Sequence, residues 1–345
     1  MRGNYFLGAE KTPKFEVRPL PQRQLGEREV LVKNMSCGIC GTDVHIYHGG
    51  KGSAEVAPPV VLGHEYAGIV EAVGSAVTTV AVGDHVAIDP NIYCGLCNPC
   101  RMGKKQNCEH LFALGVNVDG GMATHSFCPE TQCFKVHPDI PFDHAAMAEP
   151  LACALHGMDR VAIIPGEKVL IIGGGTIGLL MLQLAKLRGA GFVALSEPIA
   201  SRRAIAAELG ADAVIDPVAE DLAARFRELA GQEGADVVVE CVGNPRAIAQ
   251  AIAMAGRSGR VMLFSVPPVD GTVPLPLFEV YQKELTVMGS MINPDTHQRA
   301  VNLLNSRRIR LDGIITHAYP LAQVEEAIHM QMGSASIKVV VHPQE

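Results

Sequence analysis

Residues 40–65 concentrate side chains that can bind metal or transfer protons. The stretch begins with the segment CGTDVH at Cys40 and ends with LGHE at Glu65. Thiolate, imidazole and carboxylate groups are the ligands that zinc prefers, and a catalytic zinc needs three of them with one position left open. Taken singly, Cys40 and His64 are more simply explained as packing residues, because free cysteine is commonly buried. The case for zinc therefore depends on the rest of the chain.

A second group of potential ligands has the spacing C-x2-C-x2-C-x7-C, in a loop rich in Gly, Asn and Pro: Cys94, Cys97, Cys100 and Cys108. Four thiolates close a tetrahedral zinc site with no vacant position, which is typical of a structural zinc. An iron–sulfur cluster is the alternative, because ferredoxins also repeat C-x2-C-x2-C. Ferredoxin runs end in Cys-Pro, whereas Glu109 follows Cys108 here. The pattern therefore favours structural zinc.

A glycine-rich turn follows the apolar run 168–172 and precedes apolar residues at helical spacing. In such a strand–turn–helix, Gly173 permits the tight turn and Gly175 lets the backbone approach a pyrophosphate. Gly178 lets the helix pack closely on the strand. The helix N-terminus offers free N–H groups to the phosphates. These features predict a dinucleotide-binding unit.

A carboxylate follows the next predicted strand, 192–195, nineteen residues after Gly178. Glu197 at this position can accept hydrogen bonds from the ribose hydroxyls of NAD, and its charge repels the 2′-phosphate of NADP. The simpler interpretation is a solvated glutamate at a strand end. Arg202 and Arg203 keep NADP open, because an arginine nearby can accommodate that phosphate. The sequence predicts a preference for NAD.

The first 150 residues predict a β-rich region. Short apolar runs are separated by Gly and Pro, and few helical periods occur, which favours a partly closed β-barrel. The predicted strands are 30–32, 68–74 and 84–88.

From residue 168 onward, strands and helices alternate, which predicts an α/β doubly wound domain with a six-stranded parallel sheet. The predicted strands are 168–172, 192–195, 213–215, 237–239, 260–264 and 285–288. The helices 296–307 and 321–332 and the strand 337–341 do not continue this alternation. We therefore expect a discontinuous catalytic domain, 1–153 and 291–345, a nucleotide domain, 154–290, and a cleft between them.

Composition excludes several classes of protein. Of the 345 residues, 48% are hydrophobic and 19% are charged, so the chain can bury large cores and is not disordered. A net charge of −7 argues against a nucleic-acid surface. The N-terminus has no apolar signal segment, and four glycines interrupt the most apolar run, 169–185. A cytoplasmic protein is expected, whose ten cysteines are thiols or metal ligands.

The order of the motifs resembles the zinc-dependent medium-chain dehydrogenases along nearly the whole chain, and most closely their sorbitol and polyol dehydrogenase branch. This order is CGTDVH, LGHE, the four-cysteine loop, AEPL at residues 148–151 and GGGTIG at 173–178. The resemblance implies a GroES-like catalytic domain, a Rossmann domain, NAD, and one catalytic and one structural zinc per subunit. It also implies a homotetramer or homodimer, in which the strand 285–288 pairs across subunits.

The resemblance assigns roles to individual residues. Cys40 and His64 would ligate the catalytic zinc, and Glu65 and Glu149 would supply carboxylates directly or through water, with their order left open. Asp43 would hold the His64 ring. Thr42 and His45 would relay the proton, and Glu149 is counted with this catalytic group. The residues implied at the cofactor are Gly173, Gly175, Thr176, Ile177, Gly178, Glu197, Arg202, Ser265 and Val266.

The implied activity is the NAD-dependent oxidation of a secondary hydroxyl of a polyol, sugar alcohol or sugar derivative to a ketone. Two positions expected at the substrate depart from the animal sorbitol dehydrogenases, with Ile292 replacing an arginine and Ile46 replacing an aromatic residue. Threonine or 2,3-diol dehydrogenation on the same zinc is the alternative. A zinc-free quinone reductase or nucleotide-binding protein would lack this ligand set.

Overall fold

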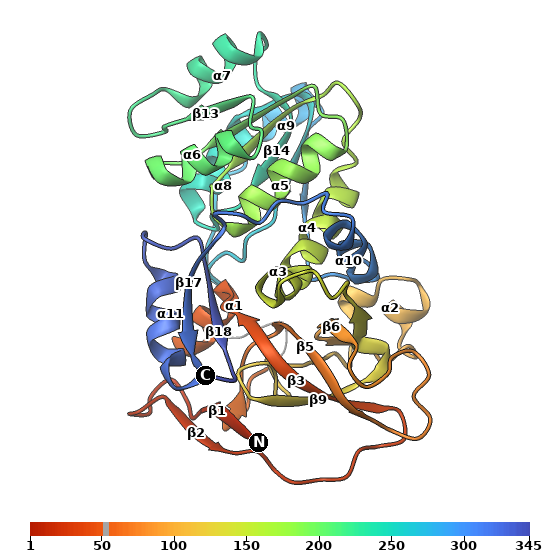
Figure 1. Cartoon of the computed structure of the whole chain (residues 1–345). Coiled ribbons are helices and arrows are strands. Elements are labelled where there is room, and N and C mark those ends of the chain that lie inside the picture. The colour runs from red at the N-terminus through yellow and green to blue at the C-terminus, as the bar shows by residue number, and fades with distance from the viewer. Residues whose placement is uncertain (51–54) are drawn as a thin grey trace. The chain divides into compact units, whose positions relative to one another are not determined.

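The protein is described by a computed structural model that covers residues 1–50 and 55–345. The chain divides into two compact units (Figure 1). The first comprises Met1–Ala152 together with Ile292–Glu345, and the second comprises Cys153–Met291. The C-terminal tail therefore belongs to the same unit as the N-terminal half of the chain.

The first unit contains a seven-stranded sheet with the order β10-β6-β5-β3-β18-β17, in which β9 also pairs with β3. Its strands are β3 (Glu29–Gly38), β5 (Glu65–Val73), β6 (His85–Ile88), β9 (His125–Pro129), β10 (Cys133–Lys135), β17 (Ile315–Pro320) and β18 (Lys338–His342). A three-stranded sheet has the order β2-β1-β4, and β7 pairs with β8. These strands are β1 (Arg2–Phe6), β2 (Phe15–Pro19), β4 (Val60–Val61), β7 (Asn91–Ile92) and β8 (Phe112–Ala113).

Strand β3 organises this unit. Alternate residues along it are buried, with Val30 and Val32 fully so, as a strand with one face on a core requires. It pairs antiparallel with β5, β9 and β18. The pairing Val340↔Gly38 brings the C-terminal strand beside the residues that lead into Cys40.

Helices of the first unit are short. They are α1 (Gly41–Tyr47), α2 (Asn98–Arg101), α3 (Phe142–Ala146), α10 (His297–Asn305) and α11 (Val324–Met332), and α4 (Ala148–Val161) begins here. Single 3-10 turns are η1 (Lys105–Asn107), η2 (Glu130–Gln132) and η3 (Leu321–Gln323). Helix α11 packs on β17, β18 and α1, and its buried face joins the core of this unit.

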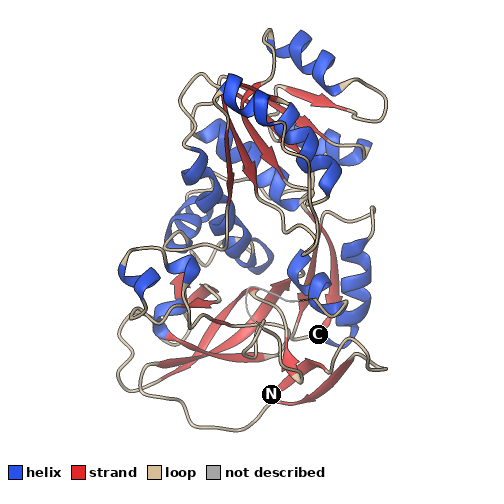
Figure 2. Cartoon of the chain, turned by 180° about the vertical axis from the view of Figure 1, so that it is seen from behind, coloured by secondary structure: helices blue, strands red, loops and turns tan. Residues whose placement is uncertain are grey.

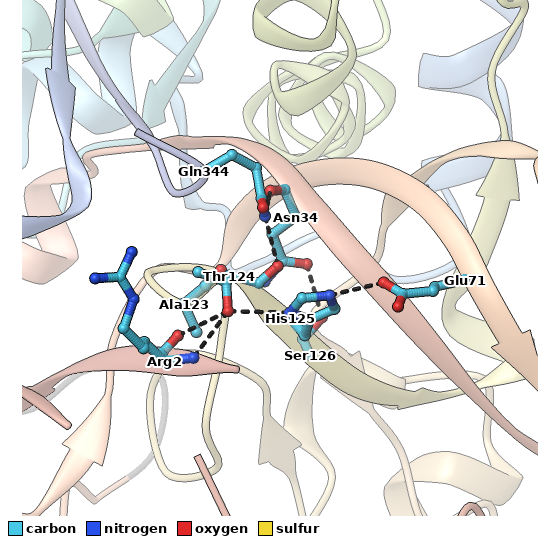
Figure 3. A network of polar contacts seen from close by, with 8 residues as sticks. All are labelled: Arg2, Asn34, Glu71, Ala123, Thr124, His125, Ser126 and Gln344. Atoms are coloured by element: carbon cyan, nitrogen blue, oxygen red, sulfur yellow. Dashed lines mark hydrogen bonds and ion pairs between the residues drawn. The ribbon is translucent and has the colours of Figure 1, made fainter. Parts of the chain in front are cut away.

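A buried polar network ties β3, the β9 region and the C-terminus together (Figure 3). The Asn34 side chain donates to Ala123 O at 2.9 Å and accepts from Ser126 Oγ at 2.9 Å. Gln344 Nε2 donates to the backbone oxygens of Asn34 (2.8 Å) and Thr124 (2.7 Å). Asn34 is fully buried, so its amide satisfies groups that water cannot reach.

Replacing Asn34 with alanine is therefore expected to lower the free energy of unfolding by about 2–4 kcal/mol. The change leaves buried groups on Ser126 and Ala123 without partners, at about 1–3 kcal/mol each. Chemical denaturation of the variant measures the loss. The control Gln298→Ala lies on the exposed face of α10 and should change stability by less than about 0.5 kcal/mol. An equal effect of both substitutions would contradict the assignment.

The second unit is a parallel six-stranded sheet with the order β13-β12-β11-β14-β15-β16, which confirms the predicted fold. Its strands are β11 (Lys168–Ile172), β12 (Phe192–Ser196), β13 (Ala213–Ile215), β14 (Ala235–Glu240), β15 (Ala255–Leu263) and β16 (Thr286–Gly289). The helices are α5 (Thr176–Leu187), α6 (Ala200–Glu208), α7 (Leu222–Ala230), α8 (Pro245–Ala253) and α9 (Leu277–Lys283). They lie on both sides of the sheet (Figure 2).

The strand order reverses between β11 and its neighbours β12 and β14. In open α/β sheets, ligands bind beyond the carboxyl ends of the strands at such a reversal. The central strand β11 is buried from Val169 to Ile172, because helices cover both faces of a parallel sheet. Within the described residues, we find no helix with the length and apolar character that a membrane span requires.

Candidate metal centres and cofactor site

The first candidate metal centre is formed by Cys40, His64 and Glu65, whose ligand atoms all lie within 4.8 Å of one another. Cys40 is the N-cap residue of α1 and lies two residues after Gly38, the last residue of β3. His64 and Glu65 stand at the start of β5, where Glu65 is opposite Gly38 of β3. The antiparallel β3–β5 pair thus brings together residues 24 and 25 positions apart.

Asp43 lies beside the His64 ring. Its Oδ2 accepts from the backbone N–H of Cys40 at 2.8 Å, and its Oδ1 lies 3.6 Å from His64 Nδ1. A carboxylate facing Nδ1 fixes the ring orientation and leaves Nε2 for a metal ion. The position of Asp43 is compatible with the role that the family resemblance implies for it.

The electrostatics of this pair favour a cation. Burial raises the pKa of Asp43, and the charge of His64 opposes that rise. Burial by itself lowers the pKa of His64, but the charges of Asp43 and Cys40 outweigh it and raise this pKa well above its ordinary value. Positive charge is therefore stabilised beside Cys40, as a zinc site with a thiolate and carboxylates requires. The donor set fits zinc.

Lys338 is a member of the site that sequence reasoning missed. The residue lies on β18, is 3% exposed, and forms an ion pair with Glu65 through Oε2. Its Nζ also donates to Ile39 O at 2.9 Å. A lysine inside the otherwise apolar run 337–341 was the available signal, since lysine is almost never fully buried unless paired.

Glu149 faces the same centre from the first turn of α4 and is 6% exposed. Its charge raises the pKa of both His64 and Lys338, although burial and nearer charges act more strongly on each. Within the described residues, the compact group of ligand atoms contains Glu65 and does not contain Glu149. The structure therefore places Glu65 in the ligand group and Glu149 beside it.

Thr42 and His45 lie three residues apart on α1, so they share one face of the helix. Thr42 is half-buried and His45 is exposed. This face of α1 therefore extends from the half-buried Thr42 to the exposed His45. Of the two positions expected near the substrate, Ile46 is 1% exposed and packs in the hydrophobic core, and Ile292 is half-buried.

The second candidate metal centre is the four-cysteine loop, where the predicted cysteines do come together. The Sγ atoms of Cys94 and Cys100 are 4.0 Å apart, as are those of Cys97 and Cys108. A tetrahedral zinc with Zn–S bonds of about 2.3 Å separates its sulfurs by about 3.8 Å. The four residues therefore fit a closed tetrahedral zinc site.

Backbone groups prepare this loop for thiolates. The N–H groups of Cys97 and Leu96 both point at Cys94 Sγ, at 3.4 Å, and lower the pKa of that thiol to about 6. The N–H of Cys94 donates to Cys108 Sγ at 3.3 Å. Thiolate is the form that binds metal, so the loop geometry supports the ligand role.

In the second unit, the glycine-rich turn has the geometry expected of it. Gly173 has φ +103°, a left-handed value that favours glycine. A Cβ on Gly178 would overlap the Gly173 carbonyl oxygen, so helix α5 approaches the turn closely. Gly175 is the N-cap of α5, and nothing lies within 4 Å of its would-be Cβ. Thr176 and Ile177 follow it, half-buried, in the first turn of the helix.

Glu197 follows β12 at the same edge of the sheet and is 3% exposed. Its Oε2 accepts from Gly174 N at 2.6 Å and its Oε1 accepts from Ile199 N at 2.9 Å. The carboxylate is thus fixed beside the glycine turn. Arg203 donates to Glu197 O and forms an ion pair with Asp216 at 2.9 Å. Arg202, the arginine expected at the cofactor, lies in the first turn of α6.

Ser265 and Val266 follow β15 at the carboxyl edge of the sheet. A Cβ on Gly243 would lie 3.0 Å from Ser265 Cβ and from Val266 O, so glycine lets this segment approach the end of β14. Ser265 is half-buried and Val266 is 64% exposed. Both residues therefore line the edge at which Gly173 and Glu197 also lie.

Comparison with known proteins gives the class to which this fold and these sites belong. The family model described as "Alcohol dehydrogenase GroES-like domain" matches residues 26–138, and the one described as "Zinc-binding dehydrogenase" matches residues 176–306. An L-threonine 3-dehydrogenase of Bacillus licheniformis is 35% identical over 337 residues, 97% of this chain and 96% of that protein. A sorbitol dehydrogenase of Bombyx mori is 32% identical over 350 residues, which cover both proteins completely.

A solved structure of a zinc-binding dehydrogenase from Sinorhizobium meliloti 1021, bound to NADP, superposes with a TM-score of 0.92. It is 38% identical and covers 99% of this chain and 100% of that chain. The protein belongs to the zinc-dependent medium-chain dehydrogenases. It is an oxidoreductase with a GroES-like domain and a Rossmann domain that binds a nicotinamide cofactor.

Proposed function

We propose that the protein oxidises a secondary hydroxyl of a polyol, sugar alcohol or sugar derivative to a ketone, with NAD as the hydride acceptor. The observation that carries the proposal is the grouping of Cys40, His64 and Glu65, with ligand atoms within 4.8 Å. Three such ligands leave one position for the substrate hydroxyl. The relation to sorbitol dehydrogenase supports the polyol class.

Each residue of the first centre has a distinct part. Cys40, His64 and Glu65 would hold the zinc, which supplies Lewis-acid polarisation of the substrate hydroxyl when bound. Asp43 orients the His64 ring through Nδ1. The four-cysteine loop would hold the second, structural zinc, because all four of its positions are filled by thiolates.

Thr42 and His45 would carry the substrate proton to solvent. The proton released by the substrate would pass through the half-buried hydroxyl of Thr42 toward the exposed ring of His45, which can exchange protons with water. A bound nicotinamide cofactor would supply the hydride acceptor. Protein groups thus remove the proton and orient the reacting carbon.

A substrate panel tests the proposal and separates it from the second candidate, L-threonine. The relation to L-threonine 3-dehydrogenase, at 35% identity, supports that candidate. Polyols, sugar acids, 2,3-butanediol and L-threonine are compared by kcat/KM, each with NAD and with NADP. The proposal expects a polyol or sugar derivative to exceed L-threonine by at least about tenfold, which corresponds to about 1.4 kcal/mol. A reversed order would establish the threonine or diol activity instead.

Cofactor preference depends on Glu197. Its buried, fixed carboxylate would accept the ribose hydroxyls and repel a 2′-phosphate, so the unmodified enzyme should prefer NAD. Replacing Glu197 with glutamine keeps the shape and removes the charge. We expect the NAD-to-NADP ratio of kcat/KM to fall by about 10–100-fold, or about 1.4–2.7 kcal/mol. An unchanged ratio would contradict this role for Glu197, and an unmodified enzyme that prefers NADP would contradict the NAD assignment.

We also propose that two copies of the chain associate through strand β16. This strand lies at the edge of the parallel sheet, where its outer N–H and C=O groups lack a neighbouring strand within the described chain. Apolar side chains are exposed next to it on α9: Leu277 (74%), Phe278 (70%) and Tyr281 (80%). A second copy presents the same edge, so the contact closes as a symmetric dimer, and two dimers would make a tetramer.

Replacing Tyr281 with glutamate is expected to convert this assembly to smaller species, because a charge enters an apolar contact. Size-exclusion chromatography with light scattering gives the mass. The matched control is Val218→Glu, since Val218 is 83% exposed and lies away from β16. The same mass for both variants and the unmodified protein would contradict association through β16.

A further inference from the structure

We infer that Lys338 is a positioning residue that orients the Glu65 carboxylate for binding of the catalytic zinc. The inference deepens the proposed function and rests on the zinc site that it describes. Lys338 lies 273 residues from Glu65 in the sequence, yet the two side chains form a buried ion pair.

The ion pair stands in a space that the fold has shaped for it. A Cβ on Gly38 would overlap the Glu65 carboxylate and would lie 2.8 Å from Lys338 Cε and 3.2 Å from its Nζ. Gly38 lies opposite Glu65 in the β3–β5 pair and opposite Val340 in the β3–β18 pair. Three strands thus hold the carboxylate and the ammonium together, and a glycine leaves the room they need.

The ammonium is fixed from two directions. Its Nζ donates to Ile39 O at 2.9 Å and contacts Oε2 of Glu65. Lys338 is 3% exposed and Glu65 is 2% exposed, so neither charge is screened by bulk water. A buried charge that loses its partner is strongly destabilising, which keeps the contact closed.

This contact fixes the orientation of the Glu65 carboxylate. Its Oε2 contacts the Lys338 ammonium, and one carboxylate oxygen lies within 4.8 Å of the ligand atoms of Cys40 and His64. Hydrogen bonds to ligating carboxylates orient them, and their loss typically weakens metal binding by about 10–100-fold. Lys338 would therefore hold Glu65 in the orientation in which its carboxylate lies beside Cys40 and His64.

The experiment measures zinc affinity by competition with a chromophoric chelator, on the purified full-length protein. The variants are Lys338→Met, Lys338→Arg, Glu65→Gln and the double variant Lys338→Met/Glu65→Gln. We expect Lys338→Met to weaken the catalytic zinc by about 10–100-fold. Lys338→Arg keeps the charge and should remain within about fivefold of the unmodified protein, and the affinity of the four-cysteine zinc should not change in any variant.

The double variant shows whether Lys338 acts through Glu65. In the Glu65→Gln background, Lys338→Met is expected to add less than about twofold, because the carboxylate it would position is gone. The double variant removes both buried charges together, so it should fold even if Lys338→Met alone does not. If Lys338→Met does not fold, Lys338→Gln replaces it, since its amide can still donate a hydrogen bond to Glu65. We then expect the zinc affinity to fall by about 3–10-fold.

Two results would overturn the inference. One is a catalytic zinc as tight in Lys338→Met, or in its replacement Lys338→Gln, as in the unmodified protein. The other is an equal loss of zinc affinity on replacing Lys338 in the protein with Glu65 and in the Glu65→Gln background. Failure of the proposed function gives a different result, an unmodified protein that binds no zinc outside the four-cysteine loop. If zinc binds at Cys40 but Glu65→Gln leaves its affinity unchanged, the role of Lys338 falls and the proposed function stands.

Discussion

Replacing Cys40 with alanine is expected to lower kcat for the secondary alcohol by about a thousandfold or more. Cys40 is one of the three side chains whose ligand atoms lie within 4.8 Å, so its loss should release the catalytic zinc. Lewis-acid stabilisation of a developing alkoxide is worth several kcal/mol, and each 1.4 kcal/mol or so is a factor of ten in rate. Steady-state kinetics at saturating NAD measure the effect.

The matched control is Cys128→Ala. Cys128 is fully buried in the first unit and belongs to its hydrophobic core, outside the ligand group. It should change kcat by less than about threefold, since its thiol contacts Cys133 Sγ and Val30 O within the core and none of the three metal ligands. Near-normal turnover by a Cys40→Ala variant that has lost its zinc would show that the zinc is not needed for the reaction.

Replacing Cys100 with serine is expected to act on stability instead. The substitution opens the four-cysteine site, and structural zinc contributes folding free energy directly. We expect the free energy of unfolding to fall by at least about 3 kcal/mol, within the range seen for loss of a metal. Thermal unfolding monitored by circular dichroism measures the change.

The same variant separates the two metal centres. Protein that remains folded should keep a kcat within about threefold of the unmodified value, because the catalytic group lies on other segments of the chain. Cys128→Ala again serves as the control, because it removes a buried thiol that lies outside the four-cysteine loop. Unchanged stability in Cys100→Ser would contradict a structural role for the loop, and a parallel loss of the zinc at Cys40 would contradict two independent centres.

The parts of the fold that followed from sequence are those with local periodicity. The run 168–172 is strand β11 with the same bounds, and the glycine turn leads into α5 as predicted. Helix α9 and strand β17 were not predicted. Residues 277–283 are exposed throughout or nearly so, and β17 lacks a clean alternation of buried residues, so neither carries the pattern that marks an element.

The residues of the candidate sites also divide into those that a local sequence pattern identifies and those that depend on pairing between distant strands. Cys40, His64 and the four clustered cysteines were predictable, because ligand type and short spacing are visible in the sequence. Lys338 was not, because its contact with Glu65 depends on β18 pairing with β3 across most of the chain. The grouping of Glu65, and not Glu149, with Cys40 and His64 among the described residues likewise depends on the β3–β5 register, which no local pattern specifies.

Zinc content per subunit tests the central claim most directly, and elemental analysis of extensively dialysed protein measures it. We predict two zinc ions per subunit in the unmodified protein. We predict one in Cys40→Ala, held by the four-cysteine loop, and one in Cys100→Ser that remains folded, held at Cys40. An unmodified protein without zinc, or two ions retained in Cys40→Ala, would contradict a catalytic zinc at Cys40, His64 and Glu65.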